Sequence, residues 1–280
     1  MPANGVPVRR HHSKIMRAAV IQLNSQNDTG HNLEAAEQLI KAAVAQGAEY
    51  VLLPENFAFF GSEQEKSAKA AEIETAARAF LKSTAAKHNI TITGGGMPIA
   101  NPAGKVFNSA VTYGPDGNEL HRYDKLHLFD VAPGDNVSYQ ESRSTAPGGG
   151  SLSLFACGSM QVGMSVCYDI RFPALYRHHA KAGAQVLCVP AAFTKLTGEA
   201  HWHVLLRSRA IENTCYVLAA AQTGTHFGGR ETFGHSLIVD PWGEVVAELG
   251  DRPGFVVHEL LPERIAGVRR RMPSLQHDRL

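Results

Sequence analysis

The sequence predicts an α/β protein in which mixed β-sheets are covered by helices. Short apolar runs alternate with helical patterns along most of the 280 residues, and this alternation favours parallel strands. Other apolar runs are joined by short turn segments, and such hairpins impose antiparallel pairing. Because no interior linker and no repeat of fixed period interrupts the pattern, we expect one domain over residues 16–280, after a mobile tail over residues 1–15.

The first elements follow from apolar periodicity and from turn residues. The run "RAAVIQL" at 17–23 predicts a buried strand, and the next segment has helical spacing, with Asn32 as its expected N-cap and Gly47 as its end. The run "YVLLPE" at 50–55 predicts a second strand. An Ala- and Glu-rich pattern then predicts one long helix over 63–88, followed by the strand "ITITGGG".

The rest of the chain contains three expected hairpins and two further strands. Turn residues predict hairpins around Pro115-Asp116-Gly117-Asn118, Gly158-Ser159 and Pro241-Trp242-Gly243. The runs "AQVLCVPAAF" and "CYVLAAAQTG" are extended segments on either side of a helix near 200–212. These elements complete a set of sheets that combines parallel with antiparallel pairing.

Composition limits the functions that are open to this chain. A formal net charge of +1 argues against nucleic acid or an anionic membrane as the main partner. No uncharged stretch is long enough to cross a bilayer, and the first fifteen residues lack the apolar core of a signal peptide. Four cysteines without metal-site spacing suggest free thiols in a reducing compartment. We therefore expect a cytoplasmic protein that acts on a small molecule.

One cysteine differs from the other three. Cys167, in "VGMSVCYDIRFP", follows an apolar strand and precedes Phe172-Pro173, which are typical of a helix start. A helix N-terminus nearby would favour the thiolate, and the sharp turn would leave the Tyr168 N–H free for an oxyanion. The alternative is that Cys167 is a small buried apolar residue. For Cys157, Cys188 and Cys215, which lie inside strand-like runs, we expect the core role.

Two ionisable residues also stand where apolar strands end. Glu55 follows Pro54 in "VLLPENFAFFG", and burial among apolar residues would raise the pKa of its carboxyl, which suits a proton shuttle. Lys125 ends a hairpin strand in "ELHRYDKLHLFD". Glu55 as a helix cap, and Lys125 paired with Asp124 or Asp130, are the structural alternatives. Since α/β sheets gather their sites at strand ends, the three positions together favour a catalytic site.

The segments "LLPENFAFFG", "RYDKLHLFD" and "SVCYDIRFP" resemble, in order and spacing, the three catalytic segments of the nitrilase superfamily of carbon–nitrogen hydrolases. The resemblance extends from about Met16 to the C-terminus. It implies a four-layer α-β-β-α sandwich and a homodimer, or a larger homo-oligomer, formed through helices beside the nucleophile. It also implies that the enzyme needs no cofactor and no metal.

The resemblance assigns roles position by position. Glu55 corresponds to the general base, Lys125 to the cation that stabilises the oxyanion and Cys167 to the nucleophile. Glu141, in "VSYQESRSTAPG", corresponds to a glutamate that orients the lysine and the substrate. The Tyr168 backbone N–H is expected to support Lys125.

Further segments resemble the deaminated-glutathione amidase branch of this family. They are "FTKLTGEAHWHVLLRSRAIENTCYVLAAAQTG", "FGHSLIVDPWGEVVAEL" and "RRRMPSLQHDR". That branch hydrolyses deaminated glutathione through a thioester and releases 2-oxoglutarate and cysteinylglycine. The implied substrate contacts are Phe193, Thr194, His203 and Arg171, although Arg171 is equally suited to a bridge with Asp169. His203 is a departure, since related members usually have glutamate there.

Other functions are also compatible with parts of the pattern. Within the family, the alternatives are an ω-amidase acting on 2-oxoglutaramate, an N-carbamoyl amino acid amidohydrolase and a nitrilase. Outside catalysis, an activated cysteine also suits a thiol redox sensor, and the fold suits an inactive scaffold. Metal-dependent hydrolysis is disfavoured because HExxH is absent and the histidine pairs at 178–179 and 201–203 do not share a helix face.

Overall fold

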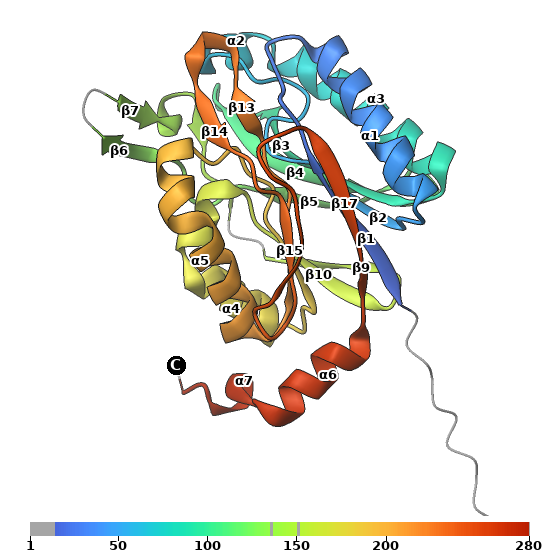
Figure 1. The fold of residues 1–280 in the computed structure, drawn as a ribbon. Helices are drawn as coiled ribbons and strands as arrows, with labels where there is room; N and C mark the ends of the chain where they lie inside the picture. The colour runs from blue at the N-terminus through green and yellow to red at the C-terminus, as the bar shows by residue number, and fades with distance from the viewer. Residues whose placement is uncertain (1–14, 135–136, 150–151, 280) are drawn as a thin grey trace, which may run out of the picture.

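Two β-sheets pack between layers of helices in the computed structural model, which describes residues 15–134, 137–149 and 152–279 (Figure 1). This arrangement is the predicted α-β-β-α order. Except for Ile15, the expected N-terminal tail lies outside the described residues.

The first sheet carries the N-terminal half of the chain and one C-terminal strand. Its strands, in spatial order, are β17 (Gly254–Leu260), β1 (Met16–Gln22), β2 (Tyr50–Leu52), β3 (Thr91–Ala100), β4 (Val106–Tyr113) and β5 (Glu119–Asp124), with β8 (Thr145–Ala146) paired to β4. β1, β2 and β3 are parallel, whereas β17 and the β3–β4–β5 meander are antiparallel. The sheet is therefore mixed, as the sequence predicts.

The second sheet carries the other half of the chain. Its strands, in spatial order, are β16 (Val245–Glu248), β15 (Leu237–Val239), β12 (Tyr216–Ala219), β11 (Val186–Cys188), β10 (Met160–Met164) and β9 (Leu154–Cys157). β10, β11 and β12 are parallel, and the predicted hairpins β9–β10 and β15–β16 close the two edges.

Helices cover the outer face of each sheet (Figure 1). α1 (Thr29–Ala45) and α3 (Ala70–His88) lie together on one side, and α4 (Pro173–Lys181) and α5 (Lys195–Asn213) lie on the other. The remaining helices are α2 (Glu63–Ala68), α6 (Pro262–Arg271) and α7 (Ser274–His277). None of the helices in the described ranges is both long and apolar enough to span a membrane.

Alternation along β1 explains why the fold has four layers. Ala18 and Val20 point into the core shared with the second sheet, whereas Ala19 and Ile21 point into the core beneath α1 and α3. Successive side chains of a strand face opposite sides of a sheet, so a strand that is apolar at every position must be covered on both faces.

Two helix boundaries differ from the prediction. The N-cap of α1 is Asp28, whose carboxylate accepts a hydrogen bond from the His31 N–H at 3.0 Å. Asn32 instead lies buried inside the helix and donates to the Ala58 carbonyl at 3.0 Å. The expected helix over 63–88 is divided at Lys69, whose φ of −98° and ψ of 9° depart from helical values. Ser62 and Glu65 form a capping box at the start of the short α2.

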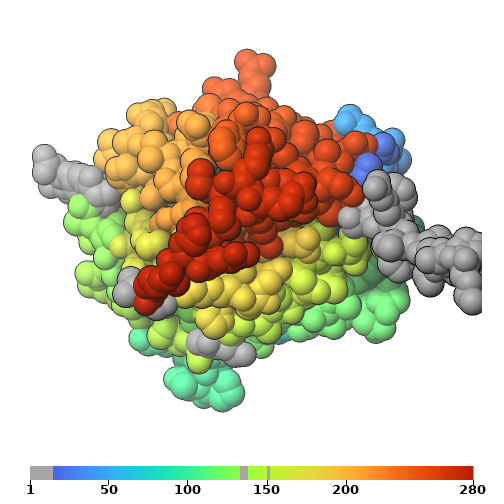
Figure 2. All heavy atoms as spheres, turned by 90° about the horizontal axis from the view of Figure 1, so that it is seen from below, coloured from blue at the N-terminus to red at the C-terminus, as the bar shows by residue number. Residues whose placement is uncertain are grey.

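The C-terminal segment was not predicted as ordered structure. β17 pairs with β1 over its full length, and then α6 and α7 cross the face that contains α4 (red across yellow in Figure 2). Asp278 contacts Arg177 at 3.5 Å and Lys181 at 3.1 Å, which fixes the end of the chain against α4. Most residues of β17 are only partly buried, so its sequence lacks the continuous apolar run that identifies the buried strands.

Candidate active site

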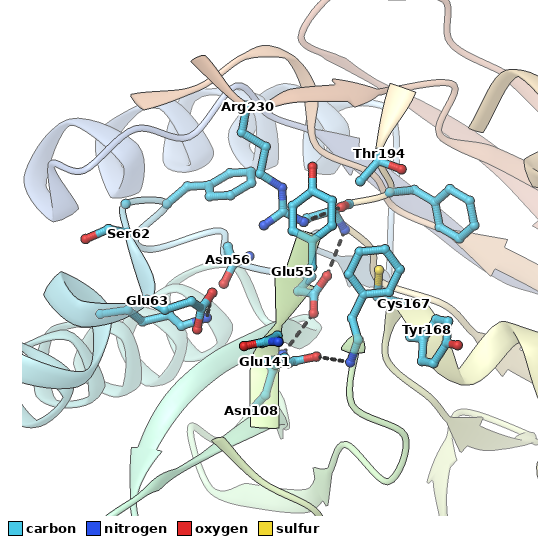
Figure 3. A pocket seen from close by; sticks show the side chains of 18 of the residues that line it. Glu55, Asn56, Ser62, Glu63, Asn108, Glu141, Cys167, Tyr168, Thr194 and Arg230 are labelled. Carbon is cyan, nitrogen blue, oxygen red and sulfur yellow. Dashed lines mark hydrogen bonds and ion pairs between the residues drawn. The ribbon is translucent and has the colours of Figure 1, made fainter. Parts of the chain in front are cut away.

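A cavity of about 340 Å³ opens where strands of both sheets end. Three of its residues lie just beyond strand ends: Lys125 follows β5 directly, Glu55 lies three residues after β2, and Cys167 lies three residues after β10. Two small hairpins, β6 (Asp130–Gly134) with β7 (Val137–Gln140) and β13 (Thr223–Thr225) with β14 (Glu231–Phe233), flank this region. The structure therefore brings together the carboxylate, the ammonium and the sulfur that the sequence singles out (Figure 3).

Cys167 occupies a strained turn between β10 and α4. Its φ of +48° lies in the left-handed region, and its N–H donates to the Pro190 carbonyl at 2.8 Å. It begins the 3₁₀ turn Cys167–Arg171, and α4 begins only at Pro173. Pro173 is thus the first residue of a helix as predicted, but Cys167 does not lie at the N-terminus of that helix.

Asp169 holds this turn, and sequence analysis did not identify that role. Its fully buried carboxylate accepts hydrogen bonds from the Val166 N–H at 2.8 Å and the Tyr123 hydroxyl at 2.7 Å. It also accepts from the His127 N–H at 3.0 Å, two residues after Lys125. Asp169 therefore links the cysteine turn to the lysine segment, and it forms no bridge to Arg171.

Glu55 is held by three donors. Its Oε1 accepts from Lys125 Nζ at 3.1 Å and from Asn108 Nδ2 at 2.9 Å, and its Oε2 accepts from the Ala192 N–H at 2.9 Å. Burial favours the protonated carboxyl, but the Lys125 ammonium and these hydrogen bonds outweigh burial and lower the pKa of Glu55. The prediction of a raised pKa is wrong because it took account of burial alone.

Lys125 lies between two carboxylates. Its ammonium is 2.9 Å from Glu141 Oε2 and 3.1 Å from Glu55 Oε1. Burial alone would lower the pKa of Lys125, but Glu141 and Glu55 raise it well above its ordinary value. Burial likewise opposes ionisation of Glu141, yet Lys125 lowers the pKa of that carboxyl to about 2. The site at rest therefore holds one ammonium between two carboxylates.

Asn108 is a further member of the site that the sequence did not reveal. It lies on β4, and its Nδ2 donates to Glu55 at 2.9 Å and to Glu141 at 3.0 Å. Gly96 on the neighbouring strand β3 has a φ of +58°, and a Cβ there would lie 2.6 Å from Glu55 Cγ and 2.8 Å from Asn108 Oδ1. The glycine run in "ITITGGG" thus leaves room for the buried polar groups. A polar residue in the apolar run "VFNSAV" is the signal that could have identified Asn108.

The surroundings of the Cys167 sulfur favour its protonated form. Burial and the neighbouring Glu55 carboxylate raise the pKa of the Cys167 thiol well above its ordinary value, although Lys125 acts in the opposite direction. The expectation of a thiolate stabilised by a helix dipole is therefore wrong. Glu55 is the neighbouring carboxylate that can take the proton of this thiol.

The expected substrate contacts divide into two groups. Tyr168, Phe193 and Thr194 line the cavity, whereas Arg171 and His203 are not among its lining residues. The Arg171 guanidinium lies over the rings of Tyr168 and Phe193, at 6.0 and 5.4 Å from their centroids. It also contacts His201 Nδ1 at 3.2 Å. His203 Nε2 contacts Glu248 Oε1 at 2.7 Å.

Two other cations face the cavity, and sequence analysis missed both. Arg230 stacks over Phe60 and Tyr139, at 5.2 and 4.9 Å from the ring centroids, and its buried Nε has no hydrogen-bond partner. Lys66 is buried, with its ammonium 2.9 Å from Glu63 Oε1. Arg230 is labelled at the upper rim in Figure 3. Because Glu63 also lines the cavity and neutralises Lys66, Arg230 supplies the positive charge away from the catalytic trio.

The other cysteines lie in the core as expected. Cys157, Cys188 and Cys215 are buried and free, and they pack among the apolar side chains of the second sheet. Burial raises the pKa of each thiol, to about 11 for Cys157, about 12 for Cys188 and about 11 for Cys215. Cys167 is therefore the cysteine that the structure places beside an ionised base.

Comparisons with known proteins identify the family of this chain. Residues 17–270 match the carbon–nitrogen hydrolase family. The deaminated glutathione amidase of Synechocystis sp. is 50% identical over 263 residues, which cover 93% of this chain and 97% of that protein. The ω-amidase NIT2 of Danio rerio is 37% identical over 269 residues, which cover 94% of each chain.

Solved structures give the same result for the fold. The crystal structure of the Caenorhabditis elegans NitFhit protein matches with a TM-score of 0.91 and 38% identity, covering 95% of this chain and 66% of that chain. Saccharomyces cerevisiae Nit3, a member of the nitrilase superfamily, matches with a TM-score of 0.82. The predicted family and the predicted four-layer sandwich are both confirmed. The chain belongs to the carbon–nitrogen hydrolase family, within the nitrilase superfamily of enzymes.

Proposed function

We propose that this enzyme is an amidase that hydrolyses deaminated glutathione to 2-oxoglutarate and cysteinylglycine. The observation that carries the proposal is the convergence of Glu55, Lys125 and Cys167 in one cavity. A relative named deaminated glutathione amidase, 50% identical over nearly the whole chain, supports the choice of substrate.

The first half-reaction forms a thioester. Glu55 takes the Cys167 proton while the sulfur attacks the amide carbonyl carbon, and negative charge develops on the carbonyl oxygen. The Lys125 ammonium and the Tyr168 N–H stabilise this oxyanion. The loss of one such donor typically costs about 2.7–4 kcal/mol of transition-state stabilisation. Glu55 then protonates the departing amine, the C–N bond breaks, and the acyl group remains on sulfur.

The second half-reaction reuses the same carboxylate. Glu55 takes a proton from a water molecule as the water oxygen attacks the thioester carbonyl. The C–S bond breaks, the thiol regains its proton and the acid leaves. Glu141 and Asn108 act as positioning residues, because both contact Lys125 or Glu55.

The charge of the cavity supports a substrate that carries carboxylates. The products 2-oxoglutarate and cysteinylglycine place a carboxylate at each end of the uncleaved amide. Arg230 lines the cavity, whereas Lys66 is paired with Glu63. The planar guanidinium of arginine suits contact with a carboxylate.

The test is a turnover screen by mass spectrometry. Deaminated glutathione, 2-oxoglutaramate, an N-carbamoyl amino acid and a nitrile are each incubated with the enzyme and with Cys167→Ala. We expect the highest kcat/KM for deaminated glutathione and no turnover by the variant. Preference for 2-oxoglutaramate would make the enzyme an ω-amidase, and turnover by Cys167→Ala would refute the nucleophile.

We also propose that the enzyme is a cytoplasmic homodimer. Leu196, Val204 and Ile211 on α5 are 60%, 64% and 49% exposed, and burying such apolar side chains favours association. Free cysteines support a reducing compartment. Light scattering after size-exclusion chromatography tests the dimer, and Val204→Glu should yield monomers if α5 forms the contact.

A further inference from the structure

Three side chains of metal-ligating type converge outside the active-site cavity. They are His203 on α5, His235 just before β15, and Glu248 at the end of β16. One candidate ligand atom from each residue lies within 4.8 Å of the other two, and no second group of this kind occurs in the parts of the chain that the structure describes. α5 packs against β14 and β15, which are labelled in Figure 1, and β15 pairs with β16, so the segments that carry the three side chains are neighbours.

Both imidazoles face the same carboxylate oxygen. His203 Nε2 lies 2.7 Å and His235 Nδ1 lies 3.0 Å from Glu248 Oε1. Ligands of tetrahedral zinc lie about 2.0–2.2 Å from the metal, which places neighbouring ligand atoms about 3.3 Å apart. The two distances to Glu248 therefore need to increase by only a few tenths of an ångström, and the two imidazole nitrogens lie within 4.8 Å of each other.

The ligands are held by rigid elements. The His235 N–H donates to the Gly250 carbonyl at 3.1 Å, and the His235 carbonyl accepts from Trp202 Nε1 at 2.8 Å. Its φ of +54° is a left-handed conformation that a non-glycine residue adopts only where its surroundings enforce it. Its ring stacks on Phe233 with the centroids 4.3 Å apart, and His203 contacts the same ring edge-on.

The donor set selects the class of ion. Two imidazole nitrogens and one carboxylate suit zinc and similar transition metals, whereas calcium and magnesium prefer oxygen ligands. The side chains of His203, His235 and Glu248 are 35%, 30% and 34% exposed, so an ion can enter and a water can complete the coordination. The geometry points to a zinc-class site formed by His203 Nε2, His235 Nδ1 and the Glu248 carboxylate.

Metal binding at this site requires no change of oxidation state. Neutral imidazoles present lone pairs to the ion when the ring protons occupy His203 Nδ1 and His235 Nε2. The ion then replaces the hydrogen bonds to Glu248 with three coordinate bonds. Because the ligands come from α5, β16 and the segment before β15, a bound ion cross-links these elements. This inference does not depend on the proposed amidase reaction.

The test is titration of the purified, tag-free protein with Zn²⁺ by calorimetry and with Co²⁺ by visible absorption. We expect one equivalent of metal, a tetrahedral Co²⁺ spectrum and a higher Tm in the presence of Zn²⁺. His203→Ala, Glu248→Gln and His235→Asn should each weaken binding by at least about tenfold. Asparagine is chosen at 235 because it tolerates the left-handed backbone. His201→Ala, an exposed histidine on the same helix, is the matched control and should bind like the unaltered protein.

Three results would overturn the inference. The first is no binding by the unaltered protein, and the second is unchanged affinity in His203→Ala and His235→Asn. The third is binding that disappears when His11 and His12 are replaced, or a Co²⁺ spectrum with sulfur charge transfer, since either result places the metal elsewhere. Circular dichroism and the metal-free Tm of each variant show whether a loss of binding reflects misfolding.

Discussion

The side-chain amide nitrogen of Asn108 lies 2.9 Å from Oε1 of Glu55, and the same nitrogen lies 3.0 Å from Oε1 of Glu141. Asn108 thereby holds both carboxylates around the Lys125 ammonium. Without this donor Glu55 would keep Lys125 and the Ala192 N–H, and Glu141 would keep Lys125 and the Phe129 N–H.

Replacement of this amide should impair catalysis more than folding. In Asn108→Leu, Glu55 loses one of the hydrogen bonds that lower its pKa, so the acidic limb of the kcat pH profile should move to higher pH. A hydrogen bond to a charged group contributes about 1.5–3 kcal/mol, which corresponds to a loss of about 10- to 100-fold in kcat. Asn118→Ala, in the exposed hairpin turn, should leave kcat unchanged. An unshifted pH profile for Asn108→Leu would remove its positioning role.

Acid should destabilise the protein through Glu141. The pKa of Glu141 falls from an ordinary 4.5 to about 2 in the folded state. A carboxyl whose pKa is lower in the folded than in the unfolded protein stabilises the fold at pH values above its pKa in the unfolded chain. This contribution is lost as the pH falls through its pKa in the folded protein. Tm should therefore decline between about pH 4.5 and pH 2, with a shallower slope in Glu141→Gln. Glu72→Gln, an exposed carboxylate on α3, is the control. Equal slopes for Glu141→Gln and the unaltered protein would contradict this prediction.

The strained backbone at Cys167 should affect the free energy of unfolding. Both Cys167→Gly and Cys167→Ala remove the sulfur and should abolish turnover. At a φ of +48°, a Cβ costs roughly 1–2 kcal/mol, so Cys167→Gly should unfold at a higher denaturant midpoint than Cys167→Ala. Ala192 is the control, because it does not have a positive φ. At this position glycine should be less stable than alanine, so Ala192→Gly should be destabilising. A less stable Cys167→Gly would argue against strain at the turn.

Arg230 should govern affinity for carboxylate substrates. Arg230→Ala removes a cation that lines the cavity, so KM for deaminated glutathione should rise by about 10- to 100-fold with a smaller change in kcat. Arg171→Ala is the comparison, because Arg171 lies behind Tyr168 and Phe193 and not among the lining residues. A larger effect at Arg171 would support the substrate contact that the sequence left open for that residue.

The sequence predicted what is local and missed what depends on distant contacts. The strands that end at Glu55, Lys125 and Cys167 have continuous apolar runs, and the turn residues of three hairpins are explicit. The direction of the Glu55 pKa depends on Lys125, which is 70 residues away in the chain, so burial alone gave the wrong sign.

Dependence on distant contacts also explains why some site residues were not predicted. Arg230 and Asn108 become site residues only when the hairpin of β13 and β14 and the edge of β4 approach the cavity. Asn32 is typical of an N-cap in composition, but Asp28 already satisfies the first turn of α1. No local sequence pattern shows which of Asp28 and Asn32 caps the helix.

Glu55 and Lys125 follow strands of the first sheet, while Cys167 and Ala192 follow strands of the second. At the junction, a Cβ on Gly95 would lie 2.1 Å from the Pro190 ring, so the two halves approach too closely for any larger residue. During refolding, secondary structure can form in either half before the nucleophile meets its base. Regain of activity must therefore wait for the halves to dock, and it reports on that late event more directly than circular dichroism does.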